Sequence, residues 1–405
     1  MRRVLVVLSA LLILVVSVYG SASAAPAVRG ATHRNVKVCS IAPAGGAGCD
    51  AIRHDLLDSS GNLISSGRIA PTATPASGRI APTATPAGFG PADIRSAYSL
   101  TSSASGGRTV AIVDAYNDPN AEVDLATYRR QYGLPACTSA SGCFRKVDQN
   151  GGTKYPRSNG GWAQEISLDL DMVSAACPDC KIVLVEAKTA SFANLGTAVN
   201  TAARLGAVAI SNSYGGSDTS ATSAYNHPGI AVTASTGDSG YGVQSPASYG
   251  TVVAVGGTSL TRNSSTRGWG ETAWSGAGSG CSTLNAKPTW QTAVTKCSGK
   301  ADADVSAVAD PNTGVAVYDS YAYQGAKGWL VFGGTSASSP IVAGVYAMSG
   351  NTSGYPASYT WAHSSSLNDV LSGSNGTCST AIWCKAGTGW DGPTGLGTPR
   401  GTVGF

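Results

Sequence analysis

The chain has 405 residues, of which 42% are hydrophobic and 12% are charged, so it can bury a full core and is not a disordered polymer. Its formal net charge is +4, with 27 basic and 23 acidic residues, and the basic excess lies within residues 1–87. The remainder is close to neutral and has no clustered positive charge for phosphates, which excludes a nucleic-acid-binding role.

The first 24 residues have the pattern of a secretory signal peptide. Arg2 and Arg3 precede an apolar run over residues 4–19, and residues 22–24 (Ala-Ser-Ala) supply the small side chains of a cleavage site. The apolar run is short for a membrane anchor, and no later stretch is long and apolar enough to cross a bilayer. We therefore expect a secreted, extracellular protein with no membrane association once residues 1–24 are removed.

The ten cysteines fall into five neighbouring pairs, which is typical of a disulfide-bonded secreted protein. Spacing alone leaves the connectivity open, and sequential pairing is the simplest choice. The C-x-x-C sequence at residues 177–180 can also indicate a redox or metal pair, but no second such sequence and no nearby histidine accompany it. Sequential pairing gives Cys39–Cys49, Cys137–Cys143, Cys177–Cys180, Cys281–Cys297 and Cys378–Cys384.

Residues 25–88 differ in composition from the rest of the chain. The sequence SGRIAPTATPA occurs twice in succession, at residues 66–76 and 77–87. Two copies rich in Pro, Thr and Ala predict an extended linker over residues 66–88, since a solenoid needs three or more packed repeats. We interpret residues 25–65 as a short pro-segment or small accessory piece.

From residue 89 onward, apolar β-branched runs alternate with segments of helical periodicity. This pattern predicts an α/β domain over residues 89–405, with a parallel sheet covered by helices on both faces. Functional groups in such sheets gather at the carboxyl ends of the strands. The expected strands are 109–115, 181–186, 207–211, 230–235, 251–255 and 329–332, and the expected helices are 119–131, 162–176, 192–205 and 336–348.

Residues 333–340 (GGTSASSP) lie between an apolar strand and an apolar helix. The glycines permit a tight turn, and Ser336 falls at or near the helix N-terminus, where free backbone N–H groups can hold a developing oxyanion. Pro340 is tolerated in the first helical turn, because N–H groups there have no intrahelical partner. The motif indicates a serine nucleophile, although a serine-rich helix cap has the same appearance.

A serine nucleophile needs a general base, which is commonly histidine. Beyond the leader only His227 and His363 are present, and both lie in polar contexts typical of a surface. The helix over 162–176 offers Glu165 and Asp169, whose spacing places both carboxylates on one face. Such a pair can raise one pKa, so that a carboxylate accepts a hydroxyl proton and returns it. A solvated acidic face is the simpler alternative.

Asp238 follows an apolar strand within the glycine-rich sequence STGDSG at residues 235–240. A carboxyl group kept neutral in an apolar site can donate a hydrogen bond to an oxyanion. An ordinary turn aspartate is the alternative interpretation.

These three motifs, in this order, resemble the sedolisin (serine-carboxyl) peptidases, including the kumamolisin-like members, over about residues 89–405. The resemblance implies a subtilisin-related fold and a secreted, monomeric serine endopeptidase that acts on polypeptides at acidic pH. It also implies that Ser336 is the nucleophile, Glu165 the general base, Asp169 its orienting partner and Asp238 the oxyanion acid.

The same resemblance implies two supporting residues and a metal site. Asp114 stands where relatives carry an acidic residue that extends the carboxyl network, and Tyr214 lies in a strand that flanks the substrate. One structural Ca²⁺ is implied near the C-terminus, where hard oxygen donors suit that ion. Its ligands are the side chains of Asp369 and Asp391 and the backbone carbonyls of Val370, Gly387 and Gly389.

The sequence departs from the family in two places. Gly333 stands where the family usually has serine, and only some 60 residues separate the signal peptide from the linker, where relatives usually carry a large folded prodomain. Two alternatives stay open. A subtilisin-type site would use Asp114 with His227 or His363 and work at neutral to alkaline pH. A secreted, non-catalytic binding module on a peptidase fold would show no hydrolysis at all.

Overall fold

The computed structural model describes residues 32–64, 86–100, 105–351 and 354–405. The predicted signal peptide therefore lies outside the described residues, as does most of the predicted linker. Within the described ranges, no helix combines the length and the apolar character that crossing a bilayer requires.

The centre of the molecule is an eight-stranded sheet in the order β13-β12-β10-β8-β5-β7-β6, with β16 also paired to β12. All of these pairings are parallel except that of β12 with β13. The strands are β5 (Thr109–Ala115), β6 (Phe144–Asp148), β7 (Lys181–Ala187), β8 (Ala209–Asn212), β10 (Ala231–Ser235), β12 (Val253–Arg262), β13 (Trp269–Ala273) and β16 (Val305–Val308).

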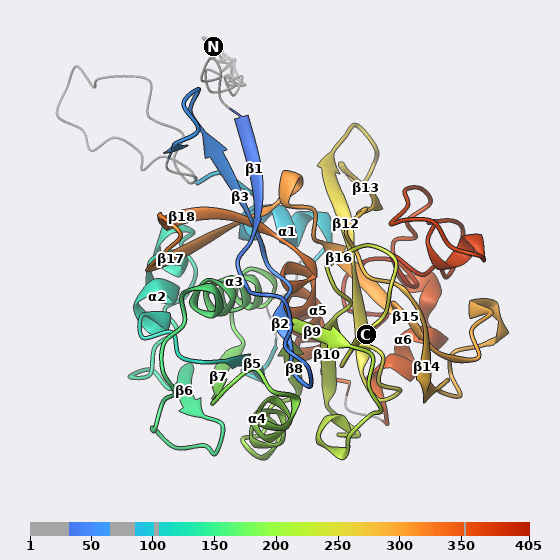
Figure 1. The fold of residues 1–405 in the computed structure, drawn as a ribbon, viewed down its shortest axis with the longest axis horizontal. Coiled ribbons are helices and arrows are strands. Elements are labelled where there is room, and N and C mark those ends of the chain that lie inside the picture. Colours follow the sequence, from blue (N-terminus) through green and yellow to red (C-terminus); the bar gives the residue numbers. More distant parts are fainter. Residues whose placement is uncertain (1–31, 65–85, 101–104, 352–353) are drawn as a thin grey trace, which may run out of the picture.

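Helices cover both faces of this sheet, and the alternation of side chains along each strand explains why. Val110 and Ile112 of β5 join one buried cluster, while Ala111 and Val113 join the cluster on the other face. Figure 1 shows α3 and α4 on opposite sides of β5 and β7. The helices are α1 (Pro91–Ala97), α2 (Ala121–Gln131), α3 (Gly160–Ala176), α4 (Phe192–Arg204), α5 (Thr335–Ser349) and α6 (Pro356–Ala362), and short 3₁₀ helices span Ser223–Tyr225, Ala293–Thr295, Pro311–Thr313, Ser364–Ser366 and Ala381–Trp383.

The predicted α/β architecture is confirmed. Each of the expected strands and helices is present, with ends that shift by a few residues. The largest difference is at β12, which continues past the expected end at residue 255 to residue 262 because its second half pairs with β13. Strand β13 lies at the edge of the sheet, where strands need not be apolar on both faces, so its sequence gives a weaker apolar signal than the central strands do.

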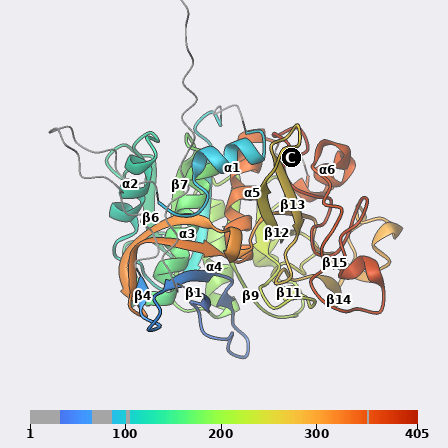
Figure 2. The ribbon, with the colours of Figure 1, turned by 90° about the horizontal axis from the view of Figure 1, so that it is seen from above.

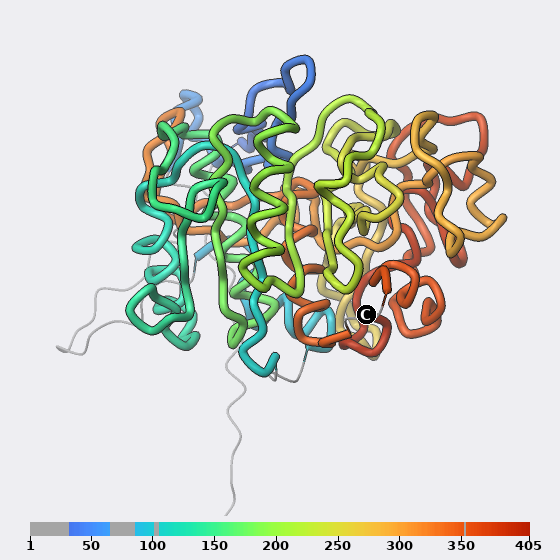
Figure 3. Tube along the Cα trace, turned by 90° about the horizontal axis from the view of Figure 1, so that it is seen from below, coloured from blue at the N-terminus to red at the C-terminus, as the bar shows by residue number. Residues whose placement is uncertain are grey.

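The segment before the linker packs onto the domain. Its strand β3 pairs antiparallel with β1, β4 and β18, and β17 completes a five-stranded sheet. Figure 2 shows the blue strands of this segment beside the orange strands β17 and β18. Figure 3 shows the blue loop of the same segment beside the green part of the chain. The strands are β1 (Thr32–Lys37), β2 (Gly48–Cys49), β3 (Ile52–Leu57), β4 (Leu63–Ile64), β17 (Val315–Tyr323) and β18 (Ala326–Gly333).

A buried arginine fixes β3 to the domain. The Arg53 side chain has no exposed surface and donates to Asp55 Oδ1 at 2.6 Å within the same strand. It also donates to Gln164 Oε1 at 3.0 Å, which lies in α3 next to Glu165. The contact ties the position of β3 to the helix that carries the predicted base.

Five disulfides are present, and they join the sequential cysteine pairs, the simplest of the connectivities that the spacing left open. The last strands complete two small sheets. They are β9 (Tyr214–Ser217), which lies between β2 and β11 (Gln244–Ser245), and the antiparallel pair β14 (Gly280–Ala286) and β15 (Gly299–Asp302).

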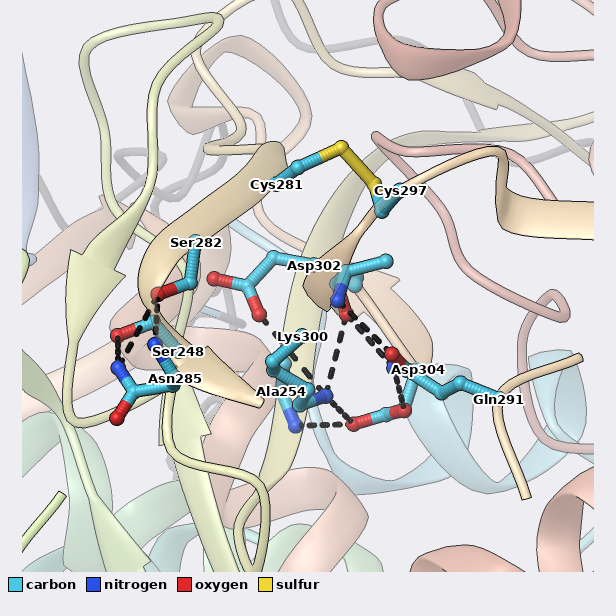
Figure 4. Close-up of polar contacts among 12 residues, drawn as sticks. Ser248, Ala254, Cys281, Ser282, Asn285, Gln291, Cys297, Lys300, Asp302 and Asp304 are labelled. Atoms are coloured by element: carbon cyan, nitrogen blue, oxygen red, sulfur yellow. Dashed lines mark hydrogen bonds and ion pairs between the residues drawn. A yellow bond between two sulfur atoms is a disulfide. The ribbon is translucent and has the colours of Figure 1, made fainter. Parts of the chain in front are cut away.

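A buried ion cluster attaches β15 to the central sheet, as Figure 4 shows. Lys300 is fully buried, with its Nζ 2.5 Å from Asp304 Oδ2 and 3.9 Å from Asp302 Oδ1. Asp304 Oδ2 also accepts from the Ala254 amide of β12 at 2.9 Å. The cluster thereby joins Lys300 of β15 to β12 through Asp304.

Candidate active site

The turn between β18 and α5 places Ser336 at the start of a buried helix. The helix begins at Thr335, so Ser336 is its second residue, and its side chain is fully buried. Gly334 precedes it with φ +98°, a conformation that favours glycine. A side chain there would come within 2.1 Å of the Asp50 carbonyl oxygen and 2.6 Å of Asp238 Oδ2, so glycine is also required by space.

Pro340 lies deeper in α5 than we expected. Because the helix begins at Thr335, Pro340 falls in the second turn, and our placement of it in the first turn is wrong. A proline at this position leaves the Ser336 carbonyl without its helical N–H donor. The Ser213 hydroxyl lies 3.4 Å from that carbonyl oxygen instead. The proline therefore frees a hydrogen-bond acceptor through which the loop after β8 attaches to the nucleophile's turn.

Helix α3 carries both predicted carboxylates and brings one of them to Ser336. The Ser336 hydroxyl donates to Glu165 Oε2 at 3.0 Å and lies 3.2 Å from the Ser213 carbonyl oxygen. The Ser213 hydroxyl lies 2.8 Å from each oxygen of Asp169. Ser213 therefore links the second carboxylate to the nucleophile. Ser213 directly precedes Tyr214, which was the residue of this stretch expected to support the site, and Ser213 itself was not expected there.

Burial raises the pKa of every carboxyl in this cluster. For Glu165 the further causes are the charges of Asp169 and Asp114, and for Asp169 the charge of Asp114 also contributes. Asp114 stands at the carboxyl end of β5, and its pKa is raised by burial and then by Glu186. Buried carboxyls that face one another retain protons, because two like charges cannot be held together out of water. The cluster therefore favours protonated carboxyls, and Glu165 lies where its ionised form could take the proton of the Ser336 hydroxyl.

Asp238 lies in the loop after β10 and contacts Thr335, the residue before Ser336. Its Oδ1 accepts from the Thr335 amide at 2.7 Å and from the Thr335 hydroxyl at 2.9 Å. Its Oδ2 is buried and has no hydrogen-bond partner in the described part of the chain. The pKa of Asp238 is raised mainly by burial and next by the charge of Asp50. A neutral Asp238 would thus carry its proton on Oδ2 and be able to donate it.

The Tyr214 hydroxyl bonds to residues other than these carboxyls. Its hydroxyl donates to Asn212 Oδ1 at 2.7 Å and lies 3.1 Å from the Tyr225 hydroxyl in a buried cluster. The backbone of Tyr214, which belongs to β9, pairs with β2. The charge of Asp114 thus acts on Glu165 and Asp169, whereas the Tyr214 hydroxyl is bonded to Asn212 and Tyr225.

Neither candidate histidine meets the nucleophile. A ring nitrogen of His227 lies 3.0 Å from the Ala224 carbonyl oxygen, and one of His363 lies 2.8 Å from the Tyr359 carbonyl oxygen. His363 also stacks on the Tyr359 ring. The hydroxyl of Ser336 bonds to Glu165 instead, so the geometry favours a carboxylate base.

Asp50 lies inside the site, although the sequence analysis left it in the leader. Its carboxyl accepts from the Ser235 hydroxyl at 2.7 Å, and its backbone carbonyl accepts from the Ser336 amide at 3.0 Å. Burial raises the pKa of Asp50 to about 7, with Ser235 and Lys37 opposing the shift. No local pattern in the sequence signals this contact, because its partners lie far along the chain.

The residues expected to bind calcium lie together in the C-terminal loops. Asp369 Oδ2 accepts from the Gly389 amide at 2.8 Å, and Asp391 Oδ2 accepts from the Gly387 amide at 3.1 Å. Asp391 is fully buried, and burial raises its pKa to about 7. Asp391 on the glycine-rich turn and Asp369 on a neighbouring loop, with Val370 next to Asp369 in the chain, offer oxygen donors of the kind that Ca²⁺ takes.

A second acidic cluster lies between α2, β17 and the loop after β5. Asp118, Asp124 and Asp319 are buried and offer oxygens within 4.8 Å of one another. Burial raises the pKa of Asp118 to about 7 and that of Asp319 to about 8. The sequence analysis missed this cluster because its members come from three separate elements.

The chain matches the model of the Subtilase family over residues 152–374, which is more than half of its length and includes Glu165, Asp169, Asp238 and Ser336. The chain belongs to the subtilase family. This subtilase is 30% identical over 355 residues to kumamolisin from Bacillus sp. (strain MN-32), an alignment that covers 77% of this chain and 62% of kumamolisin. It is 36% identical over 177 residues to sedolisin from Pseudomonas sp. (strain 101), covering 39% of this chain and 29% of sedolisin.

A solved structure agrees with these sequence matches. Pseudomonas sedolisin, a serine-carboxyl proteinase complexed with two molecules of pseudo-iodotyrostatin, resembles this subtilase with a TM-score of 0.62 and 25% sequence identity. The match covers 77% of this chain and 95% of that one. The subtilisin-like fold and the resemblance to the sedolisins are therefore confirmed. The subtilase spans less than two thirds of the length of the curated relatives named above.

Proposed function

We propose that this subtilase is a secreted serine-carboxyl endopeptidase that cleaves polypeptides through an acyl-enzyme on Ser336. The observation that carries the proposal is the 3.0 Å hydrogen bond from the Ser336 hydroxyl to Glu165 Oε2 inside a buried carboxyl cluster. The relatives kumamolisin and sedolisin support this choice of reaction. A signal-peptide pattern and five disulfides support export to an oxidising compartment.

In the proposed mechanism, Glu165 accepts the hydroxyl proton while Ser336 Oγ attacks the carbonyl carbon of the scissile bond. The Ser336 amide and a protonated Asp238 hold the oxyanion, where fixed donors stabilise developing charge. Glu165 then gives the proton to the leaving amine, and water hydrolyses the ester by the same steps. Asp169, joined to the nucleophile's turn through Ser213, shares a proton with Glu165 and holds it in position.

The mechanism requires particular protonation states, which set its pH dependence. Asp238 must keep its proton, and Glu165 and Asp169 together must hold one proton, because a doubly protonated pair cannot act as a base. Burial raises the pKa of all three carboxyls. Activity is therefore expected at acidic pH and is lost as rising pH ionises Asp238.

We further propose one structural Ca²⁺ in the C-terminal loops. The side chains of Asp369 and Asp391 and the carbonyls of Val370, Gly387 and Gly389 would hold it. When bound, the ion would cross-link this glycine-rich turn to the loop that contains Asp369 and neutralise the two carboxylates. No catalytic step passes through it.

The test is hydrolysis of a denatured protein between about pH 3 and 9, limits that bracket the carboxyl and histidine pKa values. We expect an acidic optimum that Ser336→Ala abolishes. Ser349→Ala, at the other end of the same helix, is the matched control and should keep full activity. An alkaline optimum would instead support a histidine base, and no hydrolysis at any pH would point to a non-catalytic binding module.

A further inference from the structure

Three buried aspartates from separate elements meet where α2 packs against β17, two elements that lie side by side in Figure 1. Asp118 lies in the loop after β5, Asp124 on α2 and Asp319 on β17, and each is at most 1% exposed. One carboxyl oxygen of each lies within 4.8 Å of one from each of the others. Oxygen ligands bind Ca²⁺ at about 2.3–2.6 Å, so ligands on opposite sides of the ion are about 4.6–5.2 Å apart. The three oxygens are therefore close enough to contact a single ion.

Each aspartate bonds to the protein through one oxygen and leaves the other free. Oδ1 of Asp118 and Oδ1 of Asp319 each accept from the amide two residues later, at 2.8 and 3.1 Å. Asp124 Oδ2 accepts from the amide and the hydroxyl of Ser320 at 2.8 and 3.1 Å. The second oxygen of each carboxyl is buried and has no hydrogen-bond partner among the described residues. Carboxylates that bind metals are oriented by such outer hydrogen bonds, which leave one oxygen for the ion.

A fourth oxygen comes from α3, which carries Ser167. That residue is 2% exposed, and its hydroxyl has no hydrogen-bond partner in the described ranges. Burial raises the pKa of Asp118, and the Ser167 hydroxyl beside it opposes that shift. Buried hydroxyls are normally hydrogen-bonded, because losing water without gaining a partner costs free energy. Four elements thus direct oxygens without partners to one cluster.

The three carboxyls form no ion pair in the part of the chain that the structure describes. The charge of Lys146 acts on Asp118, but its Nζ pairs with Glu186 Oε1 at 3.3 Å and donates to the Asp118 carbonyl at 2.7 Å. Like charges held together out of water need protons or a cation. A bound cation would supply the charge that the side chains around the cluster lack.

We propose that Asp118, Asp124, Asp319 and Ser167 bind one Ca²⁺ ion, at a site separate from the one proposed in the C-terminal loops. All four donors are oxygens, which suits this hard cation and not a metal that prefers nitrogen or sulfur. The inference goes beyond the proposed peptidase activity and does not depend on it.

The position of the site indicates what the ion would hold together. It would join α2 to β17 and to the loop after β5. Asp118 follows Asp114 by four residues, and its amide donates to Glu186 Oε1 at 3.0 Å. Glu186 is the partner of Asp114 in the pairing of β5 with β7. The ion would therefore fix the loop that borders the carboxyl cluster of the candidate active site.

The test is calorimetric titration of the full-length chain with Ca²⁺ at about pH 8, because carboxyl ligands must be deprotonated to bind. The parent protein carries Ser336→Ala, which prevents self-digestion, and Asp391→Asn, which removes the other proposed site. Asp124→Asn keeps an oxygen for Ser320 and replaces the free oxygen with an NH₂ group. Glu122→Gln removes one negative charge from the same helix outside the cluster and is the matched control.

We expect one Ca²⁺ per chain in the parent and in Glu122→Gln, with a Tm that rises when Ca²⁺ is added. Asp124→Asn should weaken binding at least about 100-fold, since loss of an outer-shell group alone costs about 10–100-fold. It should also lose the rise in Tm. Ser167→Ala removes a neutral ligand and should weaken binding less. If Asp124→Asn does not fold, Asp319→Asn is the substitute, because it too keeps the oxygen that accepts from the backbone.

Two outcomes would overturn the inference. Absence of Ca²⁺ binding in the parent would mean that protons or water alone satisfy the cluster. Binding that is as tight in Asp124→Asn and Asp319→Asn as in the parent would place the ion at other residues. The peptidase assignment stands or falls on hydrolysis, so neither outcome affects it.

Discussion

The two oxygens of the Asp238 carboxyl have different surroundings. Thr335 donates to Oδ1 through its amide and its hydroxyl, while Oδ2 is buried without a partner in the described part of the chain. An asparagine in the same position keeps its oxygen toward Thr335 and presents an N–H group where Oδ2 stands. Replacement by asparagine thus keeps a donor and removes the titration, whereas replacement by alanine removes both.

This difference gives a prediction for pH dependence. Asp238→Asn should keep measurable activity that extends to higher pH than in the unaltered enzyme, because an amide donates at every pH. Asp238→Ala should lose about 10²–10³-fold in kcat, as expected for one missing oxyanion donor. The measurement is kcat from pH 3 to 9 for all three proteins. Equal loss in both variants would contradict a donor role for Asp238.

At the scale of elements, β15 depends on a buried charge for its attachment. Lys300→Met should destabilise the fold by about 3–5 kcal/mol, because it leaves the Asp304 and Asp302 carboxyls buried without their cation. Lys327, on β18, is exposed, and Lys327→Met is the matched control with little expected change. Denaturant unfolding in a Ser336→Ala background avoids self-digestion. Equal stability of the two lysine variants would show that the cluster contributes nothing.

The C-terminal loops should respond to calcium. A chelator should lower Tm, and added Ca²⁺ should restore it, because a ligand that binds only the folded state stabilises it. In an Asp124→Asn background, which removes the other proposed Ca²⁺ site, Asp391→Asn should lower Tm and remove the response to the chelator, whereas Asp58→Asn, in an exposed turn, should preserve it. Thermal unfolding with and without chelator measures both effects. A chelator response that survives Asp391→Asn would place the ion elsewhere.

The sequence predicts those elements whose signals are local. The apolar periodicity of α3 and α5 and the continuous apolar runs of β5 and β7 mark buried elements of a parallel sheet, and all four are present. The strands of the N-terminal segment carry no such signal. Strand β3 owes its place to pairing with β18, roughly 280 residues later, and to the buried Arg53. Pairing over such a separation leaves no pattern within either segment.

The candidate site divides in the same way. Ser336, Glu165 and Asp169 could be found from spacing on a helix and from a glycine-rich turn. Ser213 and Asp50 could not, because each acts through backbone and hydroxyl contacts with residues that are distant in sequence. The position of Pro340 was wrong by one turn, since a sequence motif does not fix where its helix begins.

At the scale of the whole molecule, many carboxyls are buried with raised pKa values. Burial raises the pKa of Asp302 and of Asp319 to about 8 and that of Glu186 to about 7. Each group binds its proton more tightly in the folded chain than in the unfolded chain, where the Asp value is 3.8. Their contribution to stability is therefore complete below the unfolded value and is lost as the pH rises through about 7 to 8.

This charge arrangement predicts a fold that is more stable in acid than in mild alkali. The Tm of Ser336→Ala should be higher at about pH 4 than at about pH 8, because the folded state binds more protons between these values. Thermal unfolding at fixed ionic strength measures the difference. A Tm that rises from the lower pH to the higher would contradict the protonation of these buried groups.

The central claim is that Glu165 is the base for Ser336, and the most direct test is kcat/KM for Glu165→Gln beside Asp171→Asn. Both changes remove one buried carboxylate from α3, but Asp171 bonds to the Tyr318 amide and not to Ser336. We predict that Glu165→Gln loses about 10²–10⁴-fold, as expected for a general base, while folded Asp171→Asn keeps its activity across the acidic range. Normal kcat/KM in folded Glu165→Gln would contradict the account.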